Sequence, residues 1–139
     1  MVRFFLAVLT ILSIVPAKAN TNIPSFFPKK IITVTADDKG YIFIGKDTLT
    51  SMELPDEIQN RLWKSYLGTD KMYDAIHLDF KGEVPMNTKA SVKKAIHEGQ
   101  KKALTDLCLQ KHKKLFDDLN GNQQRKIRKQ FPVLFQQDY

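Results

Sequence analysis

The chain has 139 residues but only one cysteine, Cys108, and this scarcity excludes two common ways of stabilising a small protein. A single thiol cannot form an internal disulfide, and it leaves no cysteine pair for a structural zinc site. Neighbouring lysines would favour the thiolate form, but no motif supplies a base beside it. We therefore expect Cys108 to serve in core packing.

Sequence motifs of common enzymes are also missing. The chain contains no phosphate-binding G-x-x-x-x-G-K-S/T loop, no dinucleotide-binding G-x-G-x-x-G and no nucleophile motif G-x-S-x-G. The histidines His77, His97 and His112 do not have the spacing of metal ligands. We expect a protein that is not an enzyme and that binds no cofactor or metal.

Long apolar runs are confined to the first nineteen residues. Arg3 precedes the apolar run 4–15, and Ala17 and Ala19 form an A-x-A pattern, which predicts a secretory signal peptide cleaved after Ala19. The run is shorter than the roughly 20 residues that span a bilayer. The alternative is an uncleaved anchor with Arg3 in the cytoplasm. Either way, residues 20–139 are expected in the periplasm, which argues against a nucleic-acid partner.

The net charge of +7 is concentrated near the C-terminus. Residues 88–130 contain twelve Lys and Arg against four Asp and Glu. Such a segment is typical of a surface that contacts an acidic protein or an anionic polymer, but it is also typical of a helix face that is merely solvated. The candidate contact residues are Lys101, Lys102, Lys111, Lys113 and Lys114.

The segment 20–30 contains two prolines and is expected to be a linker. Alternating β-branched residues predict strands at 31–36 and 41–44, joined by a turn in which Gly40 permits positive φ. Apolar residues at every fourth position predict a helix over about 52–67, and a third strand follows at 75–80 with His77 and Asp79 on its outer face.

A long helix is predicted from Thr88 to about Phe116. The pair Asn120 and Gln123 resembles a capping box that opens a last helix, which Phe131-Pro132 ends. We expect the distal half of the long helix to dock through Leu109, Leu115 and Phe116. These side chains should contact Ile127 and Phe131 of the last helix, or a second copy of the chain.

The predicted fold class is α+β, with a small sheet of about three strands packed against two helices. A long helix extends from it into a C-terminal helical tail. The domain is expected over 31–116 and the tail over 117–139. Its core should contain Ile58, Leu62, Ile76, Leu78, Val92 and Ile96.

The order of these motifs resembles the periplasmic domain of the ExbD/TolR family of biopolymer-transport proteins. The segment "ITVTADDKGYIFIGKDTLTSMELPDEIQNRL" is similar to the family's strand, D-x-x-G-like turn, second strand and "eLp-e" helix. "AIHLDFKGEVPMNTKASVKKAI" resembles the strand, loop and helix that follow. The tail "KALTDLCLQKHKKLFDDLNGNQQRKIRKQFP" is similar to a C-terminal helical extension in one ExbD subgroup. The resemblance covers about residues 20–135.

The resemblance implies a component of a complex that uses the proton gradient to drive envelope transport. It implies an ExbB/TolQ-like channel subunit and a TonB/TolA-like transducer as partners, a homodimer, and contact with peptidoglycan. The family's membrane-embedded aspartate has no counterpart here, because no acidic residue precedes Asp37. The alternative function is a soluble periplasmic adaptor or binding module for peptidoglycan or another anionic polymer.

Overall fold

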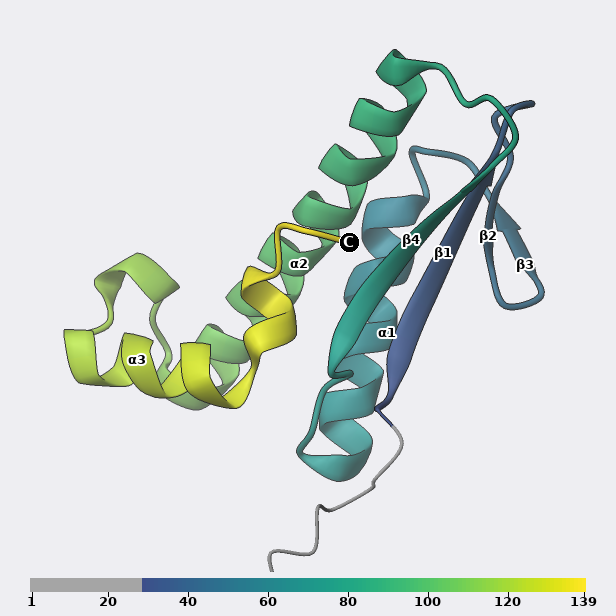
Figure 1. Cartoon of the computed structure of the whole chain (residues 1–139). Helices are drawn as coiled ribbons and strands as arrows, with labels where there is room; N and C mark the ends of the chain where they lie inside the picture. Colours follow the sequence, from purple (N-terminus) through teal and green to yellow (C-terminus); the bar gives the residue numbers. More distant parts are fainter. Residues whose placement is uncertain (1–28) are drawn as a thin grey trace, which may run out of the picture.

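A four-stranded mixed sheet organises residues 29–139, the part of the chain that the computed structural model describes (Figure 1). Its strands are β1 (Ile31–Asp37), β2 (Ile42–Ile44), β3 (Asp47–Leu49) and β4 (Ala75–Lys81), arranged in the order β3-β2-β1-β4. The predicted α+β class is confirmed, and β3 is a short strand beyond the three expected. The expected cleavage site at Ala17 and Ala19 lies outside the described residues.

The antiparallel half of the sheet depends on two tight turns. The Asp37 carboxylate accepts hydrogen bonds from the backbone N–H groups of Lys39 and Tyr41, at 3.0 and 2.9 Å. Gly40 has a φ of +87° and Gly45 a φ of +62°, a region in which glycine is the natural residue. These turns connect β1 to β2 and β2 to β3, which pair antiparallel.

The side chains of β1 and β4 alternate between a covered and an open face of the sheet. The two strands pair in parallel, with Val34 opposite Leu78. Both of these side chains are buried, whereas His77 and Asp79 are exposed on the opposite face, as the alternation predicts.

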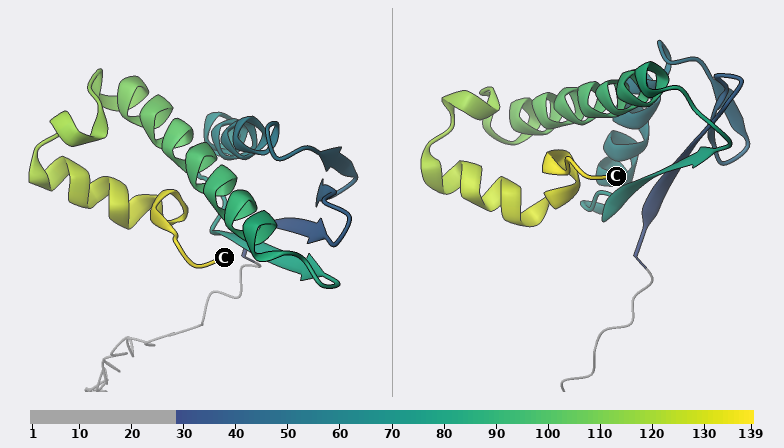
Figure 2. Two further views of the ribbon diagram at one scale, coloured as in Figure 1. Left: turned by 90° about the horizontal axis from the view of Figure 1, so that it is seen from above. Right: turned by 45° about the horizontal axis from the view of Figure 1, so that its top comes forward.

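Two helices, α1 (Leu54–Thr69) and α2 (Met86–His112), lie on the same side of the sheet (Figure 2). All six residues predicted for the core are at most 7% exposed: Ile58, Leu62, Ile76, Leu78, Val92 and Ile96. Helix α1 ends two residues later than expected, because Gly68 remains helical and Asp70, with a φ of 57°, ends the helix instead.

The two helices lie close together at Gly99 of α2. A Cβ atom placed on Gly99 would lie 2.6 Å from the Ile58 Cβ and 2.7 Å from the Pro55 carbonyl oxygen. These separations are shorter than van der Waals contact. The absence of a side chain at residue 99 is therefore what lets α1 and α2 pack at this spacing.

The C-terminal part of the chain turns back along α2 (Figure 2). Lys113 has a φ of 57° and ends α2 at His112, about four residues earlier than predicted. The short helix η1 (Phe116–Asp118), helix α3 (Gly121–Gln130) and the short helix η2 (Pro132–Phe135) follow. The predicted capping box of Asn120 and Gln123 is present, with both reciprocal hydrogen bonds formed.

The side chains that join α2 to the tail differ in part from those expected. Leu109 is 43% and Leu115 50% exposed, so the prediction that they dock onto the tail is wrong. Phe116 is half-buried, and its ring lies 5.3 Å from that of Phe135. The turn at Lys113 takes Leu115 out of the helical register from which its position was inferred. Ile127 and Phe131, the tail residues expected in this contact, are buried. The other buried residues here are Leu107, Cys108, Leu119, Val133 and Leu134.

Candidate functional site

The five lysines proposed as contact residues do not form one patch. Lys102 forms an ion pair with Asp56 of α1 at 2.5 Å. The Lys111 ammonium lies 5.2 Å from the centre of the Phe131 ring, a cation–π contact that draws it against the fold. Lys101 is exposed next to Lys102 on the middle of α2, whereas Lys113 and Lys114 lie together just after the end of the helix.

A more concentrated basic surface lies on residues 113–130, which we call the basic arm. Arg125, Lys126 and Lys129 of α3 are exposed and, with Asn122, line a shallow hollow. Their spacing of one, three and four residues places them along one side of α3. These three cations contribute to the charge of residues 88–130 but were not among the predicted contact residues, which all lie on or just after the long helix.

Arg128 has a different role from the other cations of the arm. Its guanidinium carbon lies 5.1 Å from the centre of the Phe116 ring and 4.5 Å from that of Phe135. Stacking of this kind stabilises the junction between η1, α3 and η2 through cation–π attraction. The exposed cations available to a partner are therefore Lys113, Lys114, Arg125, Lys126 and Lys129.

A buried amide attaches the last residues of the chain to α2. We call residues 132–139 the C-terminal strap. Gln100 is completely buried, and its Nε2 donates to the carbonyl oxygens of Val133 (2.7 Å) and Gln136 (3.1 Å). Its Oε1 accepts from the Tyr139 hydroxyl at 2.7 Å. Burial raises the pKa of Tyr139 to about 12, because the tyrosinate would lose hydration there.

The strap also reaches the sheet, where it attaches to the free edge of β4. The Gln136 Oε1 accepts from the backbone N–H of Ile76 at 2.8 Å, and its Nε2 donates to the Ile76 carbonyl oxygen at 2.7 Å. This side-chain amide makes the pair of bonds that a residue of a neighbouring strand would make. The C-terminus lies between α2 and β4 (Figure 1).

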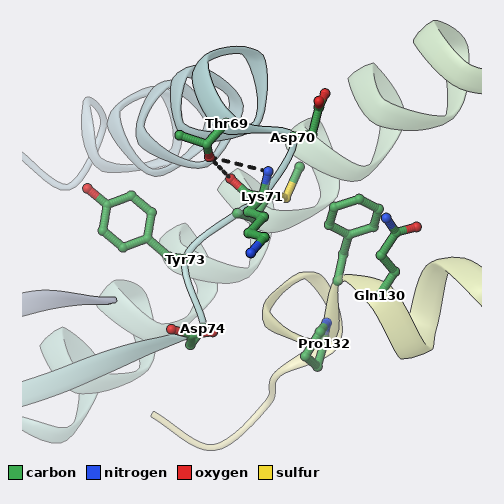
Figure 3. Close-up of a pocket in the computed structure, with 9 residues that line it drawn as sticks. Thr69, Asp70, Lys71, Tyr73, Asp74, Gln130 and Pro132 are labelled. Atoms are coloured by element: carbon green, nitrogen blue, oxygen red, sulfur yellow. Dashed lines mark hydrogen bonds between the residues drawn. The ribbon is translucent and has the colours of Figure 1, made fainter. Parts of the chain in front are cut away.

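A hollow of about 440 Å³ lies between the α1–β4 loop and the start of the strap (Figure 3). The Thr69 hydroxyl accepts from the Lys71 backbone N–H, and the Asp74 carboxylate accepts from the backbone N–H of Lys30, so several of its polar groups hold the loop itself. The lining residues include no histidine, cysteine or serine: Thr69, Asp70, Lys71, Met72, Tyr73, Asp74, Gln130, Phe131 and Pro132.

Cys108 and the histidines lie apart from these surfaces. Cys108 is buried in the core, as expected, and burial raises the pKa of its thiol. His77 and His97 are exposed on different elements, and His112 is half-buried at the end of α2. Among residues 29–139, no group of three or more His, Cys, Asp or Glu side chains is placed to hold a metal ion.

Two further observations bear on classification. No helix within residues 29–139 combines the length and apolar character needed to cross a membrane. Comparison with known proteins finds no matching family model, no matching curated protein and no matching solved structure.

Proposed function

We propose that this chain is an ExbD/TolR-like component of a proton-gradient-driven envelope transport complex, acting through protein–protein contacts of its periplasmic domain. The observation that carries the proposal is where the segments behind the family resemblance lie in the fold. The D-D-K-G segment forms the β1–β2 turn, with Gly40 at positive φ. The "ELPDEI" segment opens α1, with Pro55 in its first turn.

The surfaces of the domain are compatible with a role in contacts. One face of the sheet is open, with Thr33, His77 and Asp79 exposed on it. Exposed apolar side chains occur on the helical side as well, where Leu67 is 59% and Leu109 43% exposed. Interfaces between separately folded proteins have about the same apolar share as the rest of the surface, so these surfaces are compatible with such contacts.

In this proposal the chain works with an ExbB/TolQ-like channel subunit and a TonB/TolA-like transducer, and it forms a homodimer. The sequence before Asp37 contains no acidic residue, and an intramembrane ionisable group is the usual element of a proton pathway. The chain is therefore assigned contacts rather than a proton-carrying residue.

Co-purification from membranes tests the proposal. The full chain, tagged at its C-terminus and extracted in mild detergent, should bring down a polytopic ExbB/TolQ-like subunit. Release of all of the chain by osmotic shock, with no polytopic protein attached in detergent extracts, would contradict it.

The basic arm favours the second candidate, a soluble periplasmic adaptor for peptidoglycan or another anionic polymer. Its five available cations are offset by only Asp117 and Asp118 within residues 113–130. Binding through such a surface weakens as salt screens the charges. Sedimentation with purified peptidoglycan sacculi at increasing salt tests this candidate, and salt-sensitive retention of the chain would support it.

The form of the N-terminus separates the two localisations. If Ala17 and Ala19 mark a processing site, the mature chain should begin at Asn20 and appear in the soluble periplasmic fraction. N-terminal sequencing of the protein from each cell fraction measures this. An intact N-terminus in the membrane fraction would instead support the anchor.

A further inference from the structure

Strand β4 ends the sheet, and only part of its free edge has a partner. Because Ile76 directs its backbone N–H and C=O away from β1 to Gln136, alternation directs those of Leu78 and Phe80 the same way. Within residues 29–139, no hydrogen bond is formed by the Leu78 or Phe80 backbone groups on this edge. Unpaired edge groups of this kind are a template for another strand.

Gln136 determines where such a strand can begin. Its amide already occupies both backbone groups of Ile76, so an added strand has the groups of Leu78 and Phe80 available and not those of Ile76. At the other end, Gly82 has a φ of +78° and leaves the strand direction. The open edge therefore accepts a segment of about five residues, opposite positions 77–81.

A second copy of β4 fits this window poorly. In the antiparallel register that pairs Leu78 with Phe80 of the copy, Asp79 faces its own equivalent and His77 faces Lys81. Directly opposed like charges destabilise a strand pair. In a second register, Leu78 faces Leu78 of the copy and Phe80 faces Ile76, whose backbone groups Gln136 already occupies. In a third register, Phe80 faces Phe80 of the copy, and this would be the single hydrogen-bonded pair.

We propose that the β4 edge between Leu78 and Phe80 binds an extended segment of a different protein by strand addition. The occupant has acidic residues at its ends, facing Lys81 and His77, and a short polar residue opposite Asp79. Its two remaining side chains point to the helical side, where Phe80 is half-buried and the Lys89 ammonium lies 5.3 Å from its ring centre. This inference adds a mode of contact to the proposed function, on which it rests for the existence of a partner protein.

Amide hydrogen exchange of the full chain, followed by NMR, tests the inference directly. The probe is a capped peptide containing Glu-Val-Thr-Val-Glu, and the matched control peptide carries Lys in place of both Glu residues. The Leu78 and Phe80 amides should exchange rapidly in the free protein, and millimolar Glu peptide should slow both by roughly tenfold or more. The Lys peptide should protect neither amide.

A pair of substitutions separates edge pairing from general packing. Phe80→Pro and Phe80→Val both remove the aromatic ring, but only proline lacks the N–H that faces the edge. Peptide-induced protection at Leu78 should therefore persist in Phe80→Val and disappear in Phe80→Pro. Circular dichroism would establish that both variants are folded.

Two results would overturn the inference. One is the absence of protection at Leu78 and Phe80 at saturating Glu peptide, and the other is protection that survives in Phe80→Pro. The co-purification of a channel subunit does not depend on this edge. If the channel subunit still co-purifies but the peptide protects neither amide, only the inference is overturned. If the peptide protects both amides but no channel subunit co-purifies, only the proposed function is overturned.

Discussion

Gln100 shows how much a single buried polar residue can determine, because all of its hydrogen bonds go to the C-terminal strap. It is the only fully buried polar side chain among the described residues. A buried polar group is stabilising only when its partners are present. The geometry therefore makes the strap a part of the folded domain rather than a loose tail.

Replacing Gln100 with alanine should lower the free energy of unfolding by about 2–4 kcal/mol, from lost packing and from polar groups of the strap left without a partner. Urea denaturation measures the change. Gln110→Ala, at an exposed position of the same helix, is the control and should change stability by less than ~0.5 kcal/mol. Equal effects of the two substitutions would mean that the buried amide does not hold the strap.

Tyr139 provides a spectroscopic test of the same contact. Since its pKa in the folded chain is about 12, above the usual value of 10, the stability it contributes is retained below pH 10 and lost as the pH rises toward 12. Titration of tyrosinate absorbance should show a component that ionises late. Tyr139→Phe should remove that late component, and its persistence would assign it to another tyrosine.

At the scale of secondary-structure elements, the sequence predicted those parts that have strong periodicity. The positions of β1, β2, β4 and the buried stripe of α1 followed from apolar spacing, and the opening of α3 followed from its capping box. Strand β3 was missed because Asp47–Leu49 is too short to show alternation and has no buried side chain. The end of α2 was misplaced because a lysine, which lacks glycine's freedom, adopts the left-handed conformation there.

The candidate site was less predictable than the fold. Charge counts indicated a basic C-terminal third, but they could not indicate that Lys102 pairs with Asp56 or that Lys111 lies over an aromatic ring. Both contacts join residues distant in sequence. The bonds of Gln136 to Ile76 span 60 residues and follow no local pattern.

The contact between α1 and α2 gives a prediction in which two effects of opposite sign compete. Alanine is normally favoured over glycine in a helix by about 1 kcal/mol. Gly99→Ala should nevertheless destabilise the chain, by roughly 1–3 kcal/mol, because the added methyl group would overlap Ile58 and the Pro55 carbonyl. Thermal or urea denaturation measures whether Gly99→Ala raises or lowers the free energy of unfolding.

Gly68→Ala in α1 is the matched control for this substitution. Apart from its chain neighbours and the backbone of its own helix, no atom lies within 4 Å of a Cβ placed on Gly68. Alanine there should be neutral or stabilising by up to about 1 kcal/mol. Stabilisation by both substitutions would show that the helices can move apart at Gly99 without cost.

At the scale of the whole molecule, the uneven distribution of charge gives a test of the basic arm. Lys113→Glu with Lys114→Glu should leave the fold intact and weaken binding to an acidic partner or to peptidoglycan, with the largest loss at low salt. Lys46→Glu with Lys64→Glu changes the net charge equally at exposed positions away from the arm. Equal retention of both double variants on sacculi at every salt concentration would make the arm a solubilising surface only.

Gln136 gives a prediction about association of the whole chain. Gln136→Met would release the Ile76 groups and permit a β4 pair centred on Leu78, in which His77 faces Asp79 of the copy. We expect this variant to self-associate more than the parent chain in sedimentation velocity at tens of micromolar. Identical association of the two proteins would show that Gln136 does not protect the edge.

The attachment of the strap to Gln100 and Ile76 also has a consequence for the order in which the chain is made. The residues that cover the buried amide and the β4 edge are synthesised after the elements they cover, because Gln136 and Tyr139 follow β4 and α2 in the sequence. A growing chain that already contains α1, α2 and β4 still needs about 25 residues to reach Gln136, which takes roughly 1–5 s at ordinary rates. During that interval the Ile76 groups of the β4 edge lack their partner Gln136. In a chain that stops before Gln136, they lack it permanently.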